Sequence, residues 1–307
     1  SANISIFALS KNGLFHVLIN CLMFEILTKK LVAPDIYHMD VYALRMAQSA
    51  KPGQFLIVRV DEKGERIPLT IADFDREKGV ITIVVHALGV STKKLVALNV
   101  GDRFANFAGP LGRPSELVDM SDEELASKKI LFIAGGVGAA PVYPQVKYLA
   151  ERGFKPDVIL GTRTSGLVFY RDELRKHSKR LIIATNDGSE GVKGLVTDAL
   201  AELVEKNGEK IDMIVTIGPM IMMRAVTEYT KKLGIRTIAS LNSLMVDGTG
   251  MCGACRVTVG GKTKFTCVDG PEFDAHQVDF DEAMRRQGMY KNIEKKKMED
   301  HKCKTGL

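Results

Sequence analysis

The sequence predicts an antiparallel β-barrel, then an α/β domain with a doubly wound parallel sheet, then a small cysteine-rich domain. From Met23 to about Ala108, short apolar or alternating runs are separated by Pro-Asp, Lys-Pro-Gly and Glu-Lys-Gly turns, which is typical of a barrel. After the segment GPLGRP, buried strands alternate with helical patterns, as in a parallel sheet. Three of the five cysteines then fall within the sixteen positions from Cys252 to Cys267.

The length and composition agree with this organisation. A chain of 307 residues suggests about two domains at roughly 150 residues each, and 45% hydrophobic residues are enough to fill real cores. The divisions we expect are an N-terminal extension, the barrel, the α/β domain, the cysteine-rich domain and a basic tail, at 1–22, 23–120, 121–241, 242–280 and 281–307.

The expected elements follow in order along the chain. In the barrel, strands are expected at 23–32, 36–44, 54–60, 67–73, 80–88 and 102–108, with one helix at 91–98 that Ser91 could cap. In the α/β domain, strands are expected at 129–136, 156–164, 180–188, 211–219 and 235–242, and helices at 140–153, 171–178, 195–208 and 220–234.

Most of the net charge of +6 comes from the tail. From Arg285 to Leu307 there are eight Lys or Arg residues against three Asp or Glu, so the rest of the chain is close to neutral. The chain has no Trp and no basic stripe interleaved with aromatic residues, so no nucleic-acid partner is expected. The tail is either a solvated end or a docking segment for an acidic partner.

The N-terminal run GLFHVLINCLMF is apolar but too short to span a bilayer. It contains His16 and Asn20, and no small-residue cleavage site follows, so we expect neither a signal peptide nor a membrane span. The cysteines do not form the spread, even-numbered pattern of a secreted disulfide framework. We therefore expect a cytoplasmic protein, in which Cys21 is simply a small apolar residue.

A glycine turn in the segment FIAGGVGAAP follows the first strand of the α/β domain. Gly135, Gly136 and Gly138 would let the backbone approach a pyrophosphate, and the following helix would offer free N–H groups and a positive dipole. The spacing is G-x-G-x-x-P, with Pro141 in the place of the last Rossmann glycine. Taken alone, the turn is equally compatible with a tight turn that binds nothing.

The barrel contains a second candidate anion site. Arg66 could pair with a phosphate, Thr70 could hydrogen-bond a flavin ring, and Gly89, Ser91 and Thr92 open a helix that could cap a pyrophosphate. On these residues alone, an exposed arginine and an ordinary helix cap are the simpler interpretation.

The cysteine-rich segment has the spacing of a two-iron ferredoxin loop with one change. Cys252, Cys255 and Cys267 fill the last three ligand places, whereas the first place is Asp247. One cluster ligand is therefore oxygen, or the loop is not a cluster site; a zinc site with three Cys and one Asp is an alternative. Cys303 in the tail could also replace Asp247 as the fourth ligand.

These motifs, in this order, resemble those of the ferredoxin-NADP reductase superfamily, from Met23 to about Tyr290. The resemblance implies FAD at the barrel and NAD(H) at the α/β domain. The cofactor-binding residues it implies in the barrel and its link to the next domain are Arg66, Pro68, Leu69, Thr70, His86, Ala87, Gly89, Val90, Ser91, Thr92, Gly109 and Pro110. Those it implies in the α/β domain are Gly135, Gly136, Gly138, Ala140, Pro141, Gly161, Arg163, Asn186, Asp187, Gly188, Gly218, Pro219 and Met220.

The pattern Asp-x4-Cys-x2-Cys is similar to that of one family, the small subunits of NADH-dependent reduced ferredoxin:NADP oxidoreductase, also described as sulfide dehydrogenase subunits. The resemblance implies a 2Fe–2S cluster bound by Asp247, Cys252, Cys255 and Cys267. It also implies a heterodimer with a larger subunit that holds a second FAD and two 4Fe–4S clusters. The electron-transfer subunit of dihydroorotate dehydrogenase shares the plan with four cysteines, and stays an alternative.

The predicted function is oxidoreductase chemistry on NADH or NADPH, of the transhydrogenase type, coupled to ferredoxin by flavin-based electron bifurcation in that complex. Hydride transfer belongs to FAD and the nicotinamide, so no side chain is expected to act as a catalytic acid, base or nucleophile. Arg163 and Arg171 could favour a 2′-phosphate, whereas the resemblance assigns NAD(H) to this subunit.

Overall fold

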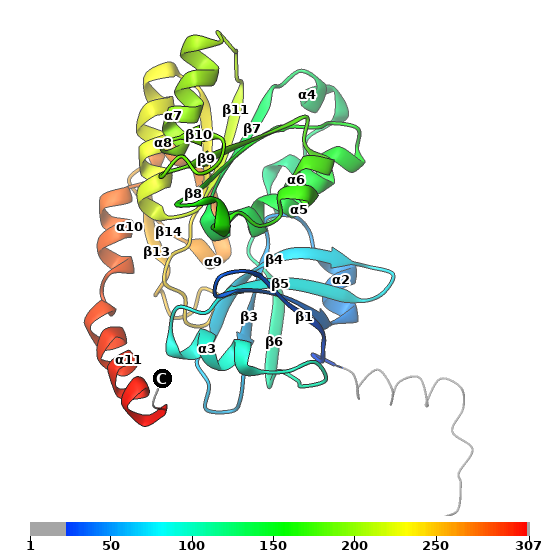
Figure 1. The fold of residues 1–307 in the computed structure, drawn as a ribbon, viewed down its shortest axis with the longest axis vertical. Coiled ribbons are helices and arrows are strands. Elements are labelled where there is room, and N and C mark those ends of the chain that lie inside the picture. The colour runs from blue at the N-terminus through cyan, green and yellow to red at the C-terminus, as the bar shows by residue number, and fades with distance from the viewer. Residues whose placement is uncertain (1–22, 306–307) are drawn as a thin grey trace, which may run out of the picture.

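The computed structural model describes the backbone of residues 23–305 and the side chains of residues 23–300. The predicted extension 1–22, with Cys21, and the side chain of Cys303 lie outside this range. An antiparallel sheet forms one half of the molecule and a parallel sheet flanked by helices forms the other (Figure 1), which confirms the predicted fold class. Within the described part of the chain, no helix is long and apolar enough to cross a membrane.

The antiparallel sheet has six strands in the order β1-β2-β5-β4-β3-β6. Their bounds are β1 Ile26–Ala33, β2 Ile36–Tyr42, β3 Phe55–Arg59, β4 Ile67–Asp75, β5 Val80–His86 and β6 Asn106–Leu111. The sheet curls until its first strand meets the segment before its last: Ile26 N donates to Asp102 O and Gly101 N donates to Ile26 O, both at 2.9 Å. Alternate residues such as Met39 and Val41 fill the interior, as expected of a small barrel.

Two helices belong to the barrel, and the sequence predicted only one. Helix α3 (Val90–Ala97) begins one residue before the expected 91, and its N-cap is Gly89, so the assignment of Ser91 as the cap was wrong. The unpredicted helix α2 (Leu44–Ser49) buries Met46 and Ala47 in the barrel core. It is six residues long and has no side-chain cap, so it carries no start signal that a sequence pattern could reveal.

The second sheet has seven strands in the order β10-β9-β8-β7-β11-β12-β15, and all adjacent pairs are parallel except β12 with β15. The strands are β7 Ile130–Gly135, β8 Asp157–Thr162, β9 Arg180–Thr185, β10 Val192–Lys193, β11 Met213–Ile217, β12 Arg236–Ser240 and β15 Glu272–Asp274. The short edge strands β10 and β15 lie outside the predicted strands.

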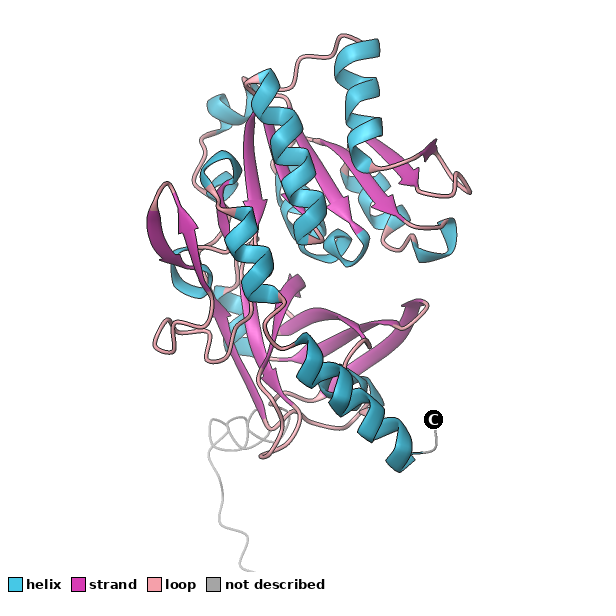
Figure 2. Cartoon of the chain, turned by 90° about the vertical axis from the view of Figure 1, so that its left-hand side faces the viewer, coloured by secondary structure: helices cyan, strands magenta, loops and turns pink. Residues whose placement is uncertain are grey.

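Helices cover both faces of this sheet (Figure 2). They are α4 Asp122–Ala126, α5 Ala139–Glu151, α6 Arg171–His177, α7 Val196–Ala201 and α8 Met220–Leu233, with short helical turns η1 Glu116–Val118, η2 Gly136–Gly138, η3 Ser165–Leu167 and η4 Glu202–Lys206. Phe132 of β7 packs with Val142 of α5, whereas its neighbour Ile133 packs in the other core with Val226 of α8. Alternate residues of a buried strand thus fill two separate cores, as a doubly wound sheet requires.

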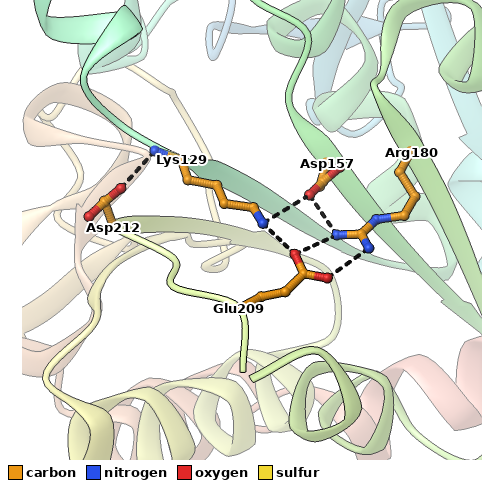
Figure 3. A network of polar contacts seen from close by, with 5 residues as sticks. All are labelled: Lys129, Asp157, Arg180, Glu209 and Asp212. Atoms are coloured by element: carbon orange, nitrogen blue, oxygen red, sulfur yellow. Dashed lines mark hydrogen bonds and ion pairs between the residues drawn. The ribbon is translucent and has the colours of Figure 1, made fainter. Parts of the chain in front are cut away.

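An ion-pair network joins the N-terminal ends of the parallel strands (Figure 3). Arg180 donates from Nη2 to Asp157 and from Nη1 to Glu209, each at 2.8 Å, and Lys129 pairs with Glu209. The Lys129 backbone N–H donates to Asp212 at 2.8 Å. Because β7, β8, β9 and β11 start at or beside these residues, the network fixes the edge of the sheet opposite the glycine turn.

The C-terminal part of the chain attaches to this second sheet. Its elements are β13 Arg256–Val259, β14 Lys262–Phe265, α9 Thr266–Asp269, η5 Ala275–Gln277, α10 Phe280–Gln287 and α11 Lys291–Thr305. Strand β15 pairs antiparallel with β12, and Phe273 packs in one core with Met223 of α8 and Val257 of β13. Helix α11 then runs back beside α3 of the barrel (Figures 1 and 2).

Candidate functional site

The predicted nucleotide turn lies at the carboxyl end of the central strand β7. A Cβ on Gly138 would lie 2.1 Å from the Ile217 carbonyl oxygen, and a Cβ on Gly218 would lie 3.0 Å from Gly135 Cα. The turns after β7 and β11 therefore touch through their backbones, which only glycine allows. Gly136 differs, because it has φ +54° and faces open space. Its backbone is thus accessible to a ligand at the helix that follows.

The other predicted nucleotide residues gather at the same edge of the sheet. Ala140 and Pro141 are in the first turn of α5, Pro219 caps α8, and Met220 begins that helix in a buried position. Gly161 is the residue of β8 paired with Gly135 of β7.

The loops after β8 and β9 lie against each other. Asn186 N donates to Thr162 O at 3.1 Å and Asp187 N donates to Arg163 O at 3.3 Å. Gly188 has φ +77°, which suits glycine in the turn of the second loop. The residues predicted from four separate motifs thus form one continuous edge, where ligands of open α/β sheets bind.

The predicted flavin motif lies on β4, next to β3. Pro68, Leu69 and Thr70 are half-buried, and Thr70 is paired with Phe55 of β3. Arg66 precedes the strand, and its Nη2 donates to the backbone carbonyl of Asp247 at 3.1 Å. The flavin motif and the cysteine loop are therefore in direct contact.

The start of helix α3 is partly tied to other elements. Gly89 N donates to Thr92 Oγ1 at 2.9 Å, and a Cβ on Gly89 would have its nearest neighbour 3.9 Å away, so this end of the helix is open. Ser91 Oγ donates to the carboxylate of Glu65, which also accepts from Lys297 Nζ at 3.1 Å. The hydrogen bond from Ser91 contributes most to lowering the pKa of Glu65, and the hydrogen bond from Lys297 lowers it further. Val90, the first residue of the helix, is half-buried.

Predicted residues of the barrel also face the α/β domain. Burial lowers the pKa of His86; the Asp35 carboxylate opposes this change, and the Arg163 cation of the α/β domain adds to it. Ala87 N donates to Asp35 O at 2.8 Å. Gly109 and Pro110 lie in β6, where a Cβ on Gly109 would come within 3.0 Å of Leu56 Cβ.

The cysteine loop has two buried thiols and one exposed thiol. Cys255 and Cys267 are each 2% exposed, and their sulfur atoms are 3.2 Å apart, whereas Cys252 is exposed. Asp247 accepts from Thr249 N and from Cys252 N, each at 2.8 Å, so its carboxylate faces the same loop. These backbone donors, Thr249 first, lower the pKa of Asp247 and keep it ionised.

This donor set fits a 2Fe–2S cluster chemically. Burial raises the pKa of the Cys267 thiol to about 12, so without a metal this thiol stays protonated, and a metal has to displace its proton. Across the described side chains, no three acidic, imidazole or thiol groups already converge on one point. The two buried sulfur atoms lie against Phe55, Ile57 and Met245, which supply the apolar wall that such clusters have.

Comparison with known proteins identifies two domains in the chain. The iron-sulfur cluster binding domain of dihydroorotate dehydrogenase B matches residues 242–279, and the oxidoreductase NAD-binding domain matches residues 132–228. A dihydroorotate dehydrogenase B electron transfer subunit homolog of Thermotoga maritima is 42% identical over 271 residues, which is 88% of this chain and 93% of that protein. The chain belongs to this family of electron-transfer subunits.

The chain is also similar to two further proteins. An uncharacterized protein of Clostridium beijerinckii is 57% identical over 89% of this chain and 93% of its own length. A chain in the solved structure of an NADH-dependent reduced ferredoxin-NADP oxidoreductase, described for flavin-based electron bifurcation, is 40% identical with a TM-score of 0.80; the match covers 90% of this chain and 98% of that one. The resemblance inferred from the motifs is thereby confirmed.

This electron-transfer subunit thus combines an NAD-binding domain, a reductase-type barrel and an iron–sulfur domain, which imply NAD(H), FAD and a 2Fe–2S cluster. Its homologues are subunits of NAD-dependent oxidoreductase complexes, so a partner subunit is expected here as well.

Sequence reasoning missed one residue that contacts the cysteine loop from outside the matched iron–sulfur domain. Arg286 of α10 donates from Nη2 to the Ala254 carbonyl at 3.1 Å, between two of the predicted ligands. No motif or spacing singles out Arg286, because it stands next to Arg285 at the start of the basic C-terminal segment.

Proposed function

We propose that this chain is the small, electron-transfer subunit of an NADH-dependent reduced ferredoxin:NADP+ oxidoreductase of the transhydrogenase type. Its partner would be a larger subunit with FAD and two 4Fe–4S clusters, through which the complex reaches ferredoxin. The observation that carries the proposal is Asp247 in the first ligand place of the cysteine loop. The likeness to the solved oxidoreductase over 98% of that chain supports it.

FAD and a 2Fe–2S cluster, when bound, would supply the chemistry that links hydride transfer with NADH to single-electron transfer. This chain binds and orients the reactants. The open backbone at Gly136 and the first turn of α5 would hold the pyrophosphate of NAD(H). The touching turns at Gly135 and Gly218 would hold the nicotinamide end, because both glycines are packed so closely against Met222 that neither has room for a side chain of its own.

In the barrel, Arg66 and the open start of α3 would hold the pyrophosphate of FAD, and Thr70 would hydrogen-bond its ring. The Arg66 guanidinium has donors to spare for a phosphate, because a single one of them is used on Asp247. Flavin and cluster would consequently occupy adjacent sites on the same side of the barrel.

The proposed cluster ligands are Asp247, Cys252, Cys255 and Cys267. The exposed side of this loop would be the face that meets the larger subunit. Cys252 is exposed there, and Met251 beside it is 89% exposed, as are large parts of Val246 and Val268. Apolar side chains around an exposed ligand suit a partner that excludes water from the path of the electron.

Oxidation of dihydroorotate by a partner is the second candidate, because the Thermotoga maritima relative is named for that system. Affinity purification of the tagged chain from its native host, without oxygen, decides between the two. We expect a co-purifying subunit with FAD and 4Fe–4S clusters, in a complex that reduces NADP+ with NADH and reduced ferredoxin. A co-purifying subunit that oxidises dihydroorotate would contradict the proposal.

The docking face can be tested in the same purification. Met251→Asp should reduce recovery of the larger subunit, because it places a charge within the apolar contact. Leu31→Asp is the matched control, since Leu31 is 63% exposed on β1 of the barrel, away from the cysteine loop. Equal loss of the partner in both variants would mean that Met251 is not at the interface.

A further inference from the structure

Two cations and two carboxylates lie beside the predicted nucleotide turn, at the carboxyl ends of β8 and β9, where the adenosine ribose of NAD(H) would bind if its pyrophosphate lies at the start of α5. Arg163 follows β8 and Arg171 begins α6, whereas Asp187 and Glu190 lie in the loop after β9. An arginine at this edge of an α/β sheet favours the 2′-phosphate of NADP, and a carboxylate favours the 2′-hydroxyl of NAD. The preference for NAD or NADP therefore depends on which of these cations are already paired with a carboxylate.

Arg171 is already neutralised. Its Nη2 forms an ion pair with the Glu190 carboxylate, and its Nε is buried without a partner. The Arg171 side chain is 38% exposed and the Glu190 side chain 29%, so the pair lies near the protein surface and not in a core. A 2′-phosphate that approached Arg171 would meet a carboxylate on the same guanidinium.

The backbone holds Glu190 in this position. Glu190 N donates to Thr185 Oγ1 at 3.0 Å, and Thr185 Oγ1 donates to Glu190 O at 2.7 Å. The next residue, Gly191, has φ +65°, and a Cβ there would lie 2.0 Å from the Ile183 carbonyl oxygen. The Glu190 backbone thus cannot shift away from Arg171 without breaking the end of β9.

The same loop is fastened to the loop after β8. Ser189 Oγ accepts from Ser165 N at 2.8 Å and donates to Asp187 Oδ1 at 2.6 Å. The second carboxylate, that of Asp187, is thereby held in the loop after β9 by Ser189. The one cation of this group without an ion pair among the described side chains is Arg163, which is exposed.

We propose that Glu190 is the residue that selects NAD(H) over NADP(H) in this subunit, by occupying the Arg171 guanidinium and repelling a 2′-phosphate. This inference rests on the proposed function, which assigns NAD(H) to this chain. It makes Arg171 a latent phosphate site that a single change of charge would expose.

The test uses the holoprotein with FAD and cluster. Glu190→Gln removes the charge and keeps the shape, and Glu190→Gln with Arg171→Met removes the exposed cation as well. Glu228→Gln is the matched control, because Glu228 forms an ion pair of 2.7 Å with Arg224 on α8. Calorimetric titration gives the Kd values of NAD+ and NADP+, and stopped-flow spectroscopy gives the rates of FAD reduction by NADH and NADPH.

We expect wild type and Glu228→Gln to prefer NAD(H). Glu190→Gln should bind NADP+ about tenfold or more tightly than wild type with NAD+ little changed, because a like charge at a phosphate is costly. The double variant should lose this gain. An unchanged ratio of the two Kd values in Glu190→Gln overturns the role of Glu190 and leaves the proposed function standing. Wild type that prefers NADP(H) overturns the NAD(H) assignment and this inference together.

Discussion

The Arg66 guanidinium donates a hydrogen bond of 3.1 Å to the backbone carbonyl of Asp247, which lies 181 residues later in the chain. One side chain of the flavin motif thus touches the residue proposed as the oxygen ligand of the cluster. Gly248 packs on the same barrel wall, since a Cβ there would lie 2.9 Å from Ile57 Cγ1. The position of the cluster loop is consequently set by the barrel.

Replacing Arg66 should affect both cofactors. We expect Arg66→Met to weaken FAD binding roughly tenfold to a hundredfold, the effect of losing a charged hydrogen bond of about 1.5–3 kcal/mol. The visible circular dichroism of the cluster should change as well, because the Asp247 carbonyl loses its donor. Arg45→Met, at an exposed position of α2, is the control and should change neither. Loss of FAD with an unaltered cluster spectrum would separate the two sites.

Replacing Asp247 tests the oxygen ligand itself. Asp247→Cys should keep a 2Fe–2S cluster and shift its reduction potential, because thiolate is a softer ligand than carboxylate. Asp247→Ala should lower the iron content. Potentiometric titration followed by electron paramagnetic resonance, together with iron analysis, measures both effects. An unchanged potential in the cysteine variant would mean that the carboxylate does not bind iron.

Arg286 should tune the cluster potential through its charge and its bond to Ala254 O. Arg286→Met should lower the potential, because the reduced cluster carries one more negative charge and loses a nearby cation. The shift should be on the order of tens of millivolts, which corresponds to about 1 kcal/mol for one electron. Arg285→Met removes an equal charge from an exposed neighbouring position. Equal shifts in both variants would argue against a specific contact.

Glu272 should make the stability of the protein depend on pH. Its residue is half-buried, but Oε2 has no accessible surface and no partner, and burial raises its pKa to about 7. The neutral acid accepts from Gln145 Nε2 at 2.7 Å. Because the folded pKa exceeds the unfolded value, this stabilisation is complete below pH 4.5 and is lost as the pH rises to about 7.

The free energy of unfolding of Glu272→Gln, relative to that of wild type, should therefore be about 2–3 kcal/mol higher at pH 8 than at pH 4.5. Denaturant unfolding of the holoprotein at both pH values measures this difference. Glu299→Gln removes an exposed carboxylate and should leave the pH dependence as it is. Parallel curves for wild type and Glu272→Gln would show that Glu272 ionises normally.

Glu209 should have the opposite dependence. Its hydrogen bond with Arg180, and then that with Lys129, lowers its pKa to about 2. The stabilisation is therefore present above pH 4.5 and lost as the pH falls toward 2. Glu209→Gln should cost about 1–3 kcal/mol at pH 7, because Arg180 and Lys129 lose their shared partner. Acid unfolding of this variant should be flatter than that of wild type between those pH values.

The two types of sheet and their order could be predicted from the sequence, because the change from alternating strands to strand–helix repeats is visible in the local periodicity of apolar residues. The sequence was also sufficient for the order of the motifs, since glycines and cysteines at fixed spacing are visible without structure. Helix α2 and strand β15 were missed because tertiary packing creates them: one has no cap, and the other has three residues that pair only with β12. The ion pair of Arg171 with Glu190 joins the start of α6 to the loop after β9, so no spacing rule could reveal it.

The pairing of β15 with β12 has a consequence for how electrons leave the protein. Three residues of β15 pair with β12, and these pairs and the core around Phe273 attach the cluster domain to the edge of the nucleotide sheet. The cluster domain therefore has a fixed position relative to the nucleotide sheet and does not move between the flavin and an electron acceptor. The partner therefore has to bind beside the cluster in order to receive its electrons. For the same reason, truncation after Leu241 would remove β15 from the edge of the sheet, and the remaining barrel and nucleotide domain would not be a stable protein alone.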